Sequence, residues 1–307
     1  LGPWLSHLYN TLLIKPRSRR VIILFTLPSQ SQQTSQYKNM TMTYHPPELH
    51  QTLQSCLLHD LKVPGIIFTH THTCIPYAIG CKTGMIVDVG CIEGRVVCYF
   101  NGEICEETLQ IVPVGYESLV QNISQWLLEE EDGDSDVHIG TKDEIMCRIA
   151  NGRDAHVKQI IHEIYYGGSQ ESLIYAFLSS LLQCPIDIRK EVVSNVVFVG
   201  GGVAGIPNFE QRFMKFMQED LYTKCQEEET EVEADAKKVS RKRAPYTMNN
   251  NLLKRFTSLV PVINGAPMRV LYPLAINPSC AAWVGGSIMG AVKQSTWSND
   301  EWVTSNE

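Results

Sequence analysis

Three consecutive glycines, Gly200, Gly201 and Gly202, follow a short apolar run at residues 196–199 and come shortly before Pro207. Because glycine has no Cβ, such a run lets the backbone turn sharply or approach a phosphate group closely. A tight turn from a strand into a helix would explain the glycines without any ligand. The sequence therefore predicts either a nucleotide-binding turn or a turn of the same shape that serves folding alone.

A second candidate site is the stretch Asp88-Val89-Gly90-Cys91-Ile92, which ends an apolar run. A carboxylate at this place can contact a metal ion, directly or through water. The alternative is an aspartate at the end of a strand whose oxygens accept hydrogen bonds from the amides of the following turn. Both interpretations of Asp88 stay open at this point.

Two histidines, His70 and His72, flank Thr71 in the stretch "FTHTHTC". On a strand, residues two apart lie on the same face, so the pair would suit two ligands of a metal site. Without a third ligand close by in the sequence, polar packing is the alternative that we favour. No nucleophile–histidine–acid triad is visible, although the members of a triad need not be neighbours along the chain.

The composition limits the classes of function. The chain has 307 residues, of which 44% are hydrophobic and 19% charged, with a formal net charge of −7. This acidic balance argues against general binding of nucleic acid or of a membrane surface. No run of about 18 apolar residues predicts a membrane span. The ten cysteines form no C-x-x-C pair, so we expect buried thiols in a reducing cytosol rather than a zinc or redox motif.

Hydrophobic periodicity predicts strands that alternate with helices. Strands are expected at residues 20–27, 64–68, 196–199 and 268–272, with a hairpin at 84–90 and 95–102. Helices are expected at residues 48–61, 116–130, 155–165, 170–182 and 281–292, and the small residues of the last one favour close packing. Such alternation is typical of an α/β fold.

A further helix is expected to begin after Asn208. Phe209, Phe213 and Phe216 would lie on its apolar face, and Asn208 with Gln211 would form a capping box. Near the end of the chain, Trp297 and Trp302 would either anchor a partner or pack onto the last helix.

Polar and charged stretches predict surface loops. We expect them at residues 29–43, at the acidic run 129–136, and at residues 225–243, which are acidic and then basic. The basic patch at 237–243 would also fit a nuclear localisation signal, but a solvated loop is the interpretation that we favour.

Three stretches, in the order in which they occur, resemble the actin family. Residues 84–90, with "VCYFNGE" and "VPVGYESLV" after them, resemble the second phosphate-binding hairpin and the helix beyond it. Residues 183–213 resemble the adenosine-side strand with its glycine turn and following helix, and residues 280–292 resemble the late helix with a tryptophan and two glycines. Order and spacing agree along most of residues 20–302, and three such stretches are far more specific than one glycine run.

The resemblance implies an actin-like α/β fold of the actin, sugar-kinase and chaperone ATPase superfamily. In that fold, two related lobes of mixed β-sheets flanked by helices close on ATP and a divalent metal. Residues 1–110 would form the first lobe, including the second phosphate hairpin at 84–102, and residues 111–307 the second lobe with a charged insertion at 225–243. Since the family's first phosphate hairpin would precede Leu1, the first lobe is expected to be incomplete at its N-terminus.

The family's nucleotide-binding positions fall on five residues of this chain. They are Asp88, Gly90, Gly200, Gly201 and Gly202. The family hairpin has the pattern Asp-x-Gly-Asp-Gly, whereas Cys91 and Ile92 stand here for the last two residues. The change removes a metal-shell carboxylate and narrows the backbone conformations available around a phosphate. We therefore expect ATP or ADP with Mg²⁺ that is not hydrolysed, or no nucleotide, and Asp88 as a weak metal ligand through water.

Three other positions depart from the family pattern. Thr71 replaces the glutamine that orients the attacking water, Ile206 replaces an aromatic residue, and Ser279 replaces a lysine near the base. Threonine is shorter than glutamine and does not reach as far. The resemblance, with these departures, implies a protein that is not an enzyme.

Within the family, the stretches "SRRVII" and "LLQCPIDIRK" are most similar to the divergent actin-related proteins at the pointed end of dynactin. This implies a non-catalytic cytoplasmic subunit of the cytoskeleton that caps a short actin-related filament and supports dynein-driven transport along microtubules. Its partners would be filament protomers, the pointed-end dynactin subunits and, indirectly, dynein, with no nucleic acid and no membrane insertion. The alternatives are an ATP-hydrolysing actin-like filament protein and a nuclear actin-related subunit of a chromatin complex.

Overall fold

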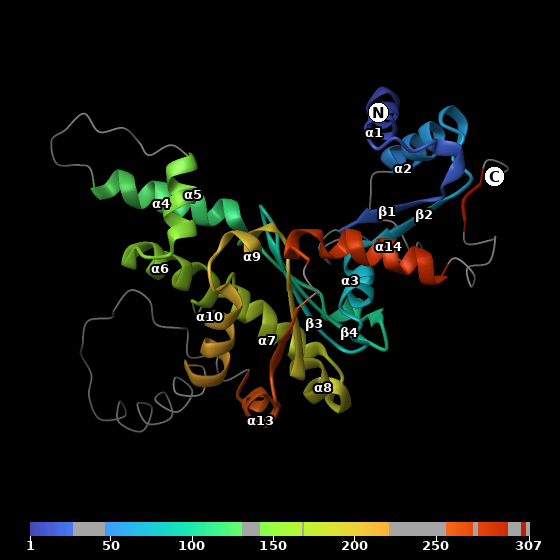
Figure 1. The fold of residues 1–307 in the computed structure, drawn as a ribbon. Helices are drawn as coiled ribbons and strands as arrows, with labels where there is room; N and C mark the ends of the chain where they lie inside the picture. The colour runs from blue at the N-terminus through green and yellow to red at the C-terminus, as the bar shows by residue number, and fades with distance from the viewer. Residues whose placement is uncertain are drawn as a thin grey trace, which may run out of the picture. The chain divides into compact units, whose positions relative to one another are not determined.

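The computed structural model describes residues 1–26, 47–130, 142–167, 169–220, 256–272, 276–293 and 302–304. It shows an α/β protein whose mixed sheets are flanked by helices (Figure 1). The loops predicted at 29–43 and 225–243, most of the acidic run at 129–136, the basic patch at 237–243 and Trp297 lie outside the described residues.

The chain divides into two compact units. The first unit comprises Leu1–Gly80 and Ala282–Glu307, and the second comprises Cys81–Ala281. The division therefore differs from the predicted boundary near residue 110, because the hairpin at 84–102 belongs to the second unit. The chain also returns to the first unit after residue 281, which a boundary drawn along the sequence does not capture.

The first unit is built on two parallel strands. β1 (Val21–Phe25) pairs with β2 (Ile66–His70), from Val21 opposite Ile66 to Phe25 opposite His70. Its helices are α1 (Gly2–Thr11), α2 (Pro47–Gln54), the π-helix Ser55–Asp60, α3 (Thr71–Ile79) and α14 (Ala281–Lys293). A small core lies between β2 and the helices before it, and it consists of Leu5, Leu57, Leu58, Val63, Ile66 and Phe68.

Small residues let α14 pack closely within the first unit, as the sequence predicts. A Cβ on Gly285 would collide with the carbonyl oxygen of Cys74 in α3. A Cβ on Gly290 would lie 2.8 Å from Ile22 Cδ1 in β1. The glycines of this helix are therefore explained by backbone-to-neighbour contact.

Trp302 is buried and is not an exposed anchor for a partner. Its ring lies 3.3 Å from where a Cβ on Gly65 would be, and the guanidinium of Arg20 lies 4.7 Å above the ring centre. The next residue, Val303, exchanges two backbone hydrogen bonds of 3.0 Å with Ile66 in β2. The chain end is thus held against β2 and the turn before it.

The second unit contains a six-stranded mixed sheet. Its strands are β3 (Gly84–Val89), β4 (Gly94–Phe100), β5 (Glu103–Ile104), β6 (Gln110–Val112), β7 (Asn195–Val199) and β8 (Arg269–Leu271). The order is β5-β4-β3-β7-β8, and β6 pairs with β4. β3 and β4 form the predicted antiparallel hairpin, whereas β7 runs parallel to both β3 and β8. β7 is buried along its whole length, which agrees with its continuous apolar sequence.

Helices surround this sheet. They are α4 (Tyr116–Glu130), α5 (Lys142–Asn151), α6 (Ala155–Ile161) with the π-helix His162–Tyr166, α7 (Leu173–Gln183), α8 (Arg189–Ser194), α9 (Gly201–Gly205), α10 (Phe209–Lys215) with the π-helix Phe216–Asp220, and α13 (Val260–Asn264). The prediction of a helix at 116–130 is confirmed to the residue, whereas α5 was not predicted.

Aromatic side chains fill the core between α10 and the sheet. Phe213 is fully buried, and its ring centre lies 5.3 Å from that of Phe177 and 5.2 Å from that of Phe198. The apolar face predicted for this helix is therefore confirmed. The predicted capping box is wrong, because Asn208 has a φ of +55° and its side chain makes no capping hydrogen bond. Asparagine tolerates this left-handed conformation better than most residues, so Asn208 serves the turn instead.

The described cysteines are all free, but only some are buried. Cys74, Cys98 and Cys184 are buried, whereas Cys91, Cys147 and Cys280 are exposed. Burial raises the pKa of the Cys74 thiol to about 12. The prediction of buried thiols therefore holds only for part of the set.

In the part of the chain that the structure describes, no helix is both long and apolar enough to cross a membrane.

Candidate functional site

The two glycine-containing turns of the sequence lie side by side in the second unit. β3 and β7 are parallel neighbours, and Asp88 lies opposite Val199 in their register. The turn that begins at Gly90 and the turn that begins at Gly200 therefore leave the sheet at the same edge. Ligands of open α/β sheets bind at this kind of edge, outside the carboxyl ends of the strands. The structure thus brings together the five residues predicted for nucleotide binding.

Gly200 and Gly202 have no side chain because the turn packs directly on the end of β3. Gly200 has a φ of +99°, and a Cβ there would lie 2.6 Å from Asp88 Oδ1 and closer still to the carbonyl oxygen of Val89. A Cβ on Gly202 would lie 2.6 Å from Val89 Cγ1 and 2.8 Å from the Val89 oxygen. Packing alone therefore requires glycine at both positions, whether or not a ligand binds.

Gly201 differs from its two neighbours. A Cβ on Gly201 would meet no heavy atom within 4 Å, and its φ is not positive. The backbone at Gly201 therefore faces open space, where a ligand group could approach it. Packing explains the lack of a side chain at Gly200 and Gly202, but it does not explain the lack of one at Gly201.

The hairpin between β3 and β4 is tied to the start of α4. The backbone N–H of Gly90 donates to the backbone carbonyl oxygen of Glu93 at 2.9 Å. The carbonyl oxygens of Gly90 and Cys91 accept from the backbone N–H groups of Tyr116 (3.0 Å) and Glu117 (2.8 Å). These bonds use the amides at the beginning of α4 to hold the hairpin, so those amides are directed at protein rather than at a ligand.

The tip of the hairpin presents a thiol and an aliphatic side chain. Cys91 is exposed, and Ile92 is 72% exposed. A loop that wraps a phosphate needs small residues and backbone freedom, which a β-branched side chain restricts. The exposed Ile92 side chain at the tip therefore restricts the backbone where a phosphate would be wrapped.

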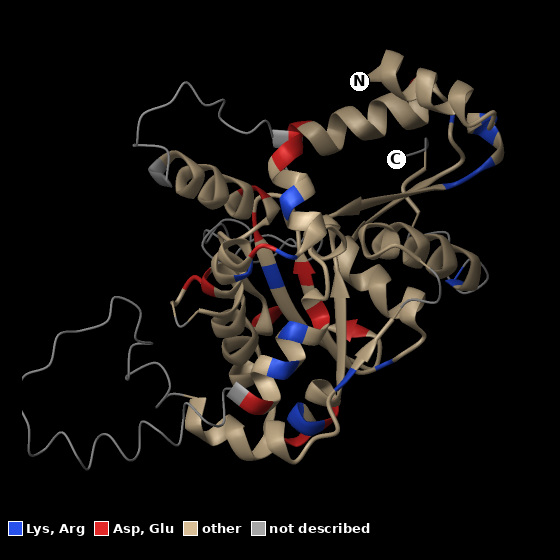
Figure 2. Ribbon diagram, turned by 60° about the vertical axis from the view of Figure 1, so that its left-hand side comes forward, with Lys and Arg blue, Asp and Glu red and all other residues tan. Residues whose placement is uncertain are grey.

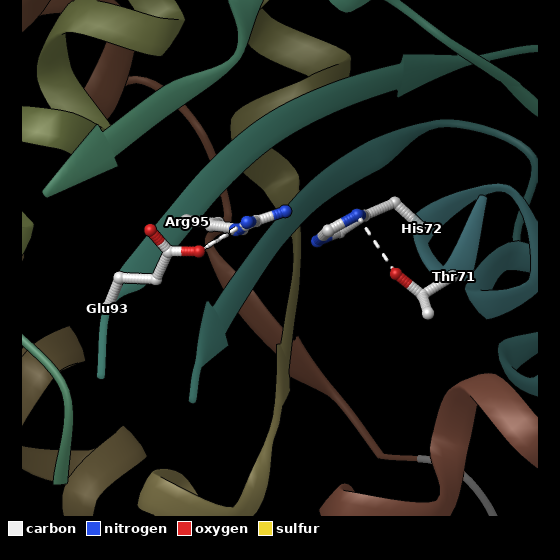
Figure 3. Close-up of polar contacts among 4 residues, drawn as sticks. All are labelled: Thr71, His72, Glu93 and Arg95. Atoms are coloured by element: carbon white, nitrogen blue, oxygen red, sulfur yellow. Dashed lines mark hydrogen bonds and ion pairs between the residues drawn. The ribbon is translucent and has the colours of Figure 1, made fainter. Parts of the chain in front are cut away.

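An ion pair that the sequence analysis did not single out lies beside Asp88. Arg95 lies opposite Asp88 in the hairpin, and its Nε donates to Glu93 Oε1 at 2.8 Å, while a second guanidinium nitrogen contacts the same oxygen (Figure 3). The Arg95 side chain is only 12% exposed. Opposite charges two residues apart, at the start of the second strand of a hairpin, are the signal that could have predicted this pair.

The carboxylates of the hairpin lie beside other protein groups. Glu93 is engaged with Arg95, and Asp88 Oδ1 lies against the Gly200 turn. Over the described ranges, no three His, Cys, Asp or Glu side chains are grouped in a way that could hold a metal ion. The residues present at this edge of the sheet would thus supply Mg²⁺ with at most one carboxylate, that of Asp88.

The His70–Thr71–His72 stretch belongs to the first unit and does not form one face of a strand. β2 ends at His70, and α3 begins at Thr71, so the expected strand geometry is wrong. The same-face argument for two residues of a strand therefore does not apply to His70 and His72. His72 is fully buried, and its Nδ1 lies 3.3 Å from Thr71 Oγ1 (Figure 3). This arrangement agrees with polar packing.

Two further positions border the glycine turn. Ile206, where the family has an aromatic residue, is 3% exposed and belongs to the hydrophobic core. Ser279 donates its backbone N–H to Asn277 Oδ1 at 2.9 Å. The carbonyl oxygen of the preceding residue, Pro278, accepts a hydrogen bond of 3.2 Å from the backbone N–H of Gly200. The side chain of Ile206 therefore serves packing rather than stacking on a base.

No known protein-family model matches the chain.

Proposed function

We propose that this protein is a non-catalytic, actin-related subunit that caps the pointed end of the short filament of dynactin. The observation that carries the loss of catalysis is the hairpin tip, where Cys91 and an exposed Ile92 stand in place of a carboxylate and a glycine. Such a tip neither completes the ligand shell of a metal ion nor leaves the backbone free to wrap a phosphate.

The arrangement of the chain supports a place in the actin family. A hairpin of β3 and β4 continues in a mixed sheet, a glycine turn follows the parallel strand β7, and the chain then returns to the first unit with α14. These are the three stretches that carry the sequence resemblance, and each occupies a defined place in the fold. The actin-like topology as a whole is part of the proposal.

A cap must stop a contact that would otherwise repeat. Head-to-tail interfaces between identical protomers generate open filaments, because each added subunit presents the same free face again. A subunit that matches the last protomer on one face but differs on the other ends the series. We propose that this protein works in this way in the cytoplasm, together with the other pointed-end subunits of dynactin, and thereby supports dynein-driven transport.

The glycine turn supports nucleotide binding only in part. Gly201 offers an open approach to the backbone, whereas Gly200 and Gly202 are already explained by packing on Val89. The open backbone at Gly201 would hold the phosphates of ATP or ADP, and Asp88 would contact Mg²⁺ through water. Any nucleotide would then serve as a structural ligand that joins the parts of the site.

The nucleotide content of the full-length protein tests the loss of catalysis. The protein is denatured immediately after purification and again after a day at 25 °C, and the released nucleotide is identified by chromatography. We expect the ATP-to-ADP ratio to stay the same, because the hairpin lacks the groups that promote hydrolysis. Gly201→Phe should remove bound nucleotide by filling the open space at the turn, with Gly201→Ala as the matched control that retains it. Steady production of ADP by the unaltered protein, but not by Gly201→Phe, would contradict the proposal.

A further inference from the structure

A separate cavity in the second unit has the properties of an anion site. It has a volume of about 320 Å³ and lies between the segment of α6 and its π-helix on one side and the segment of α10 and its π-helix on the other. Its lining consists of Lys158, His162, Tyr166, Arg212, Lys215 and Phe216. None of these residues belongs to the glycine turns, so the cavity is distinct from the site described above.

Three cations converge on this cavity from two helical segments. Arg212 and Lys215 are three residues apart on α10, and such residues share a helix face. Lys158 on α6 faces the same space. His162, one turn further along the chain, lines the same side of the cavity as Lys158. Figure 2 marks the basic positions of α10 in blue, one turn apart along the helix. This concentration of positive charge contrasts with the net charge of −7 of the whole chain.

The acidic side chains near these cations include Glu219 and Glu210; burial, and to a lesser extent the charge of Glu210, raises the pKa of Tyr166 in the cavity lining. Among the described residues, Glu219 is the acid within ion-pair distance of the three, with 3.9 Å between its Oε2 and Lys215 Nζ. Both side chains of that pair are about two-thirds exposed (68% and 67%), so the attraction is weak. Lys158 Nζ donates to the carbonyl oxygen of Arg153 at 3.4 Å. The charges of Lys158 and Lys215 are therefore only weakly compensated by these two contacts.

The floor of the cavity is aromatic and fixed in place. Tyr166 and Phe216 are each 2% exposed, and their rings stack with centres 6.2 Å apart. The Tyr166 hydroxyl donates to the carbonyl oxygen of Phe209 at 3.1 Å, which holds the ring in one orientation. Burial raises the pKa of Tyr166, and the positive charge of Arg212 opposes that rise. Arg212 thus lines the cavity beside an aromatic floor that is fixed in orientation.

We propose that this cavity binds the phosphoryl group of a small molecule, with Arg212 as the central ligand and Lys158 and Lys215 on either side. A phosphoryl dianion carries two negative charges and several acceptor oxygens, which suits a planar guanidinium flanked by two ammonium groups better than a single carboxylate does. The volume is at the lower end of ligand pockets, so the molecule is small. The source is either free phosphate or the phosphoryl group of a mononucleotide.

Calorimetric titration of the full-length protein at constant ionic strength tests this site. Inorganic phosphate and adenosine monophosphate serve as the two probes. We expect saturable binding of at least one of them, and an affinity about tenfold lower in Arg212→Gln, because a charge-assisted hydrogen bond is lost. Lys215→Gln should weaken binding less, since Lys215 is exposed and contributes mainly charge. Adenosine monophosphate binding tenfold tighter than phosphate would identify a nucleotide site, and equal binding a phosphate site.

Two control variants separate binding in this cavity from a general charge effect and from binding at the glycine turn. Lys190→Gln removes an exposed lysine of α8 outside the cavity and should leave the affinity unchanged, which excludes the charge effect. Gly201→Phe blocks the glycine turn and should also leave it unchanged. The proposal is overturned if neither probe binds, if Arg212→Gln binds as the unaltered protein does while its melting temperature is also unchanged, or if binding is lost in Gly201→Phe alone.

Discussion

Gly200→Ala is expected to destabilise the protein strongly, although it adds a single methyl group. Gly200 has a φ of +99° and a ψ of 159°, a conformation that is nearly restricted to glycine. The added Cβ would also lie 2.6 Å from Asp88 Oδ1 and closer to the backbone oxygen of Val89, which a side-chain rotation cannot relieve. We expect a loss of about 2–5 kcal/mol in the free energy of unfolding, from backbone strain and overpacking together. Thermal unfolding followed by circular dichroism measures it.

The same substitution one residue further on is the matched control. Gly201→Ala adds a methyl group that meets no atom within 4 Å, at a position in α9 without a positive φ. Its free energy of unfolding should stay within about 1 kcal/mol of the original, or rise, because alanine is the better helix residue. An equal loss of stability in both variants would contradict the close packing of Gly200 on the end of β3.

Phe213→Ala is expected to have a comparable or larger effect. Phe213 is fully buried, and its ring contacts those of Phe177 and Phe198 at centre distances of 5.3 and 5.2 Å. Truncation leaves a cavity in the part of the core that joins α10 to α7 and β7, and removal of a buried phenyl ring costs about 3–5 kcal/mol. Urea unfolding should show a lower midpoint with an unchanged slope.

The neighbouring exposed position controls for the helix itself. Gln211 lies on the solvent side of α10, and Gln211→Ala should change the free energy of unfolding by less than about 0.5 kcal/mol. A loss of a similar size in Gln211→Ala and Phe213→Ala would show that α10 as a whole is marginal. In that case, the aromatic core would not be the source of its stability.

Elements with a strong local pattern could be predicted from the sequence. The hairpin of β3 and β4, the strand β7 and the helix α4 follow from continuous apolar runs and from helical periodicity, which need no knowledge of distant residues. The predicted helix face with Phe209 and Phe213 is confirmed for the same reason, since both side chains are fully buried. The periodicity of apolar and polar residues within one helix or strand is a local property of the chain.

Features that depend on distant contacts or on turn conformation could not be predicted in this way. The division into units depends on the return of residues 282–307 to the N-terminal part, which no local pattern records. Asn208 has the residue type of a cap, but the turn after Pro207 places it at a positive φ. His72 lies in a helix because the strand ends at His70, and a run of threonine and histidine favours neither state strongly.

The contacts within the candidate site could not be predicted from the sequence. Asp88 and the glycine run were recognised separately, and the resemblance to actin placed them together. The parallel pairing of β3 with β7 now supplies the physical reason, because it places Asp88 opposite Val199. The Arg95–Glu93 ion pair and the packing of Gly200 and Gly202 on Val89 depend on three-dimensional proximity. They favour the folding explanation, of the two that the sequence leaves open, for Gly200 and Gly202 but not for Gly201.

Growth of single filaments tests the proposed function most directly. Filaments of the actin-related protomer of dynactin are imaged with marked ends, with and without the full-length protein at nanomolar concentration. We predict that growth stops at the pointed end and continues unchanged at the other end, and that no ATP is consumed by the added protein. Pointed ends that elongate at the same rate with and without the protein would contradict the proposal, as would incorporation of the protein along the length of the filament.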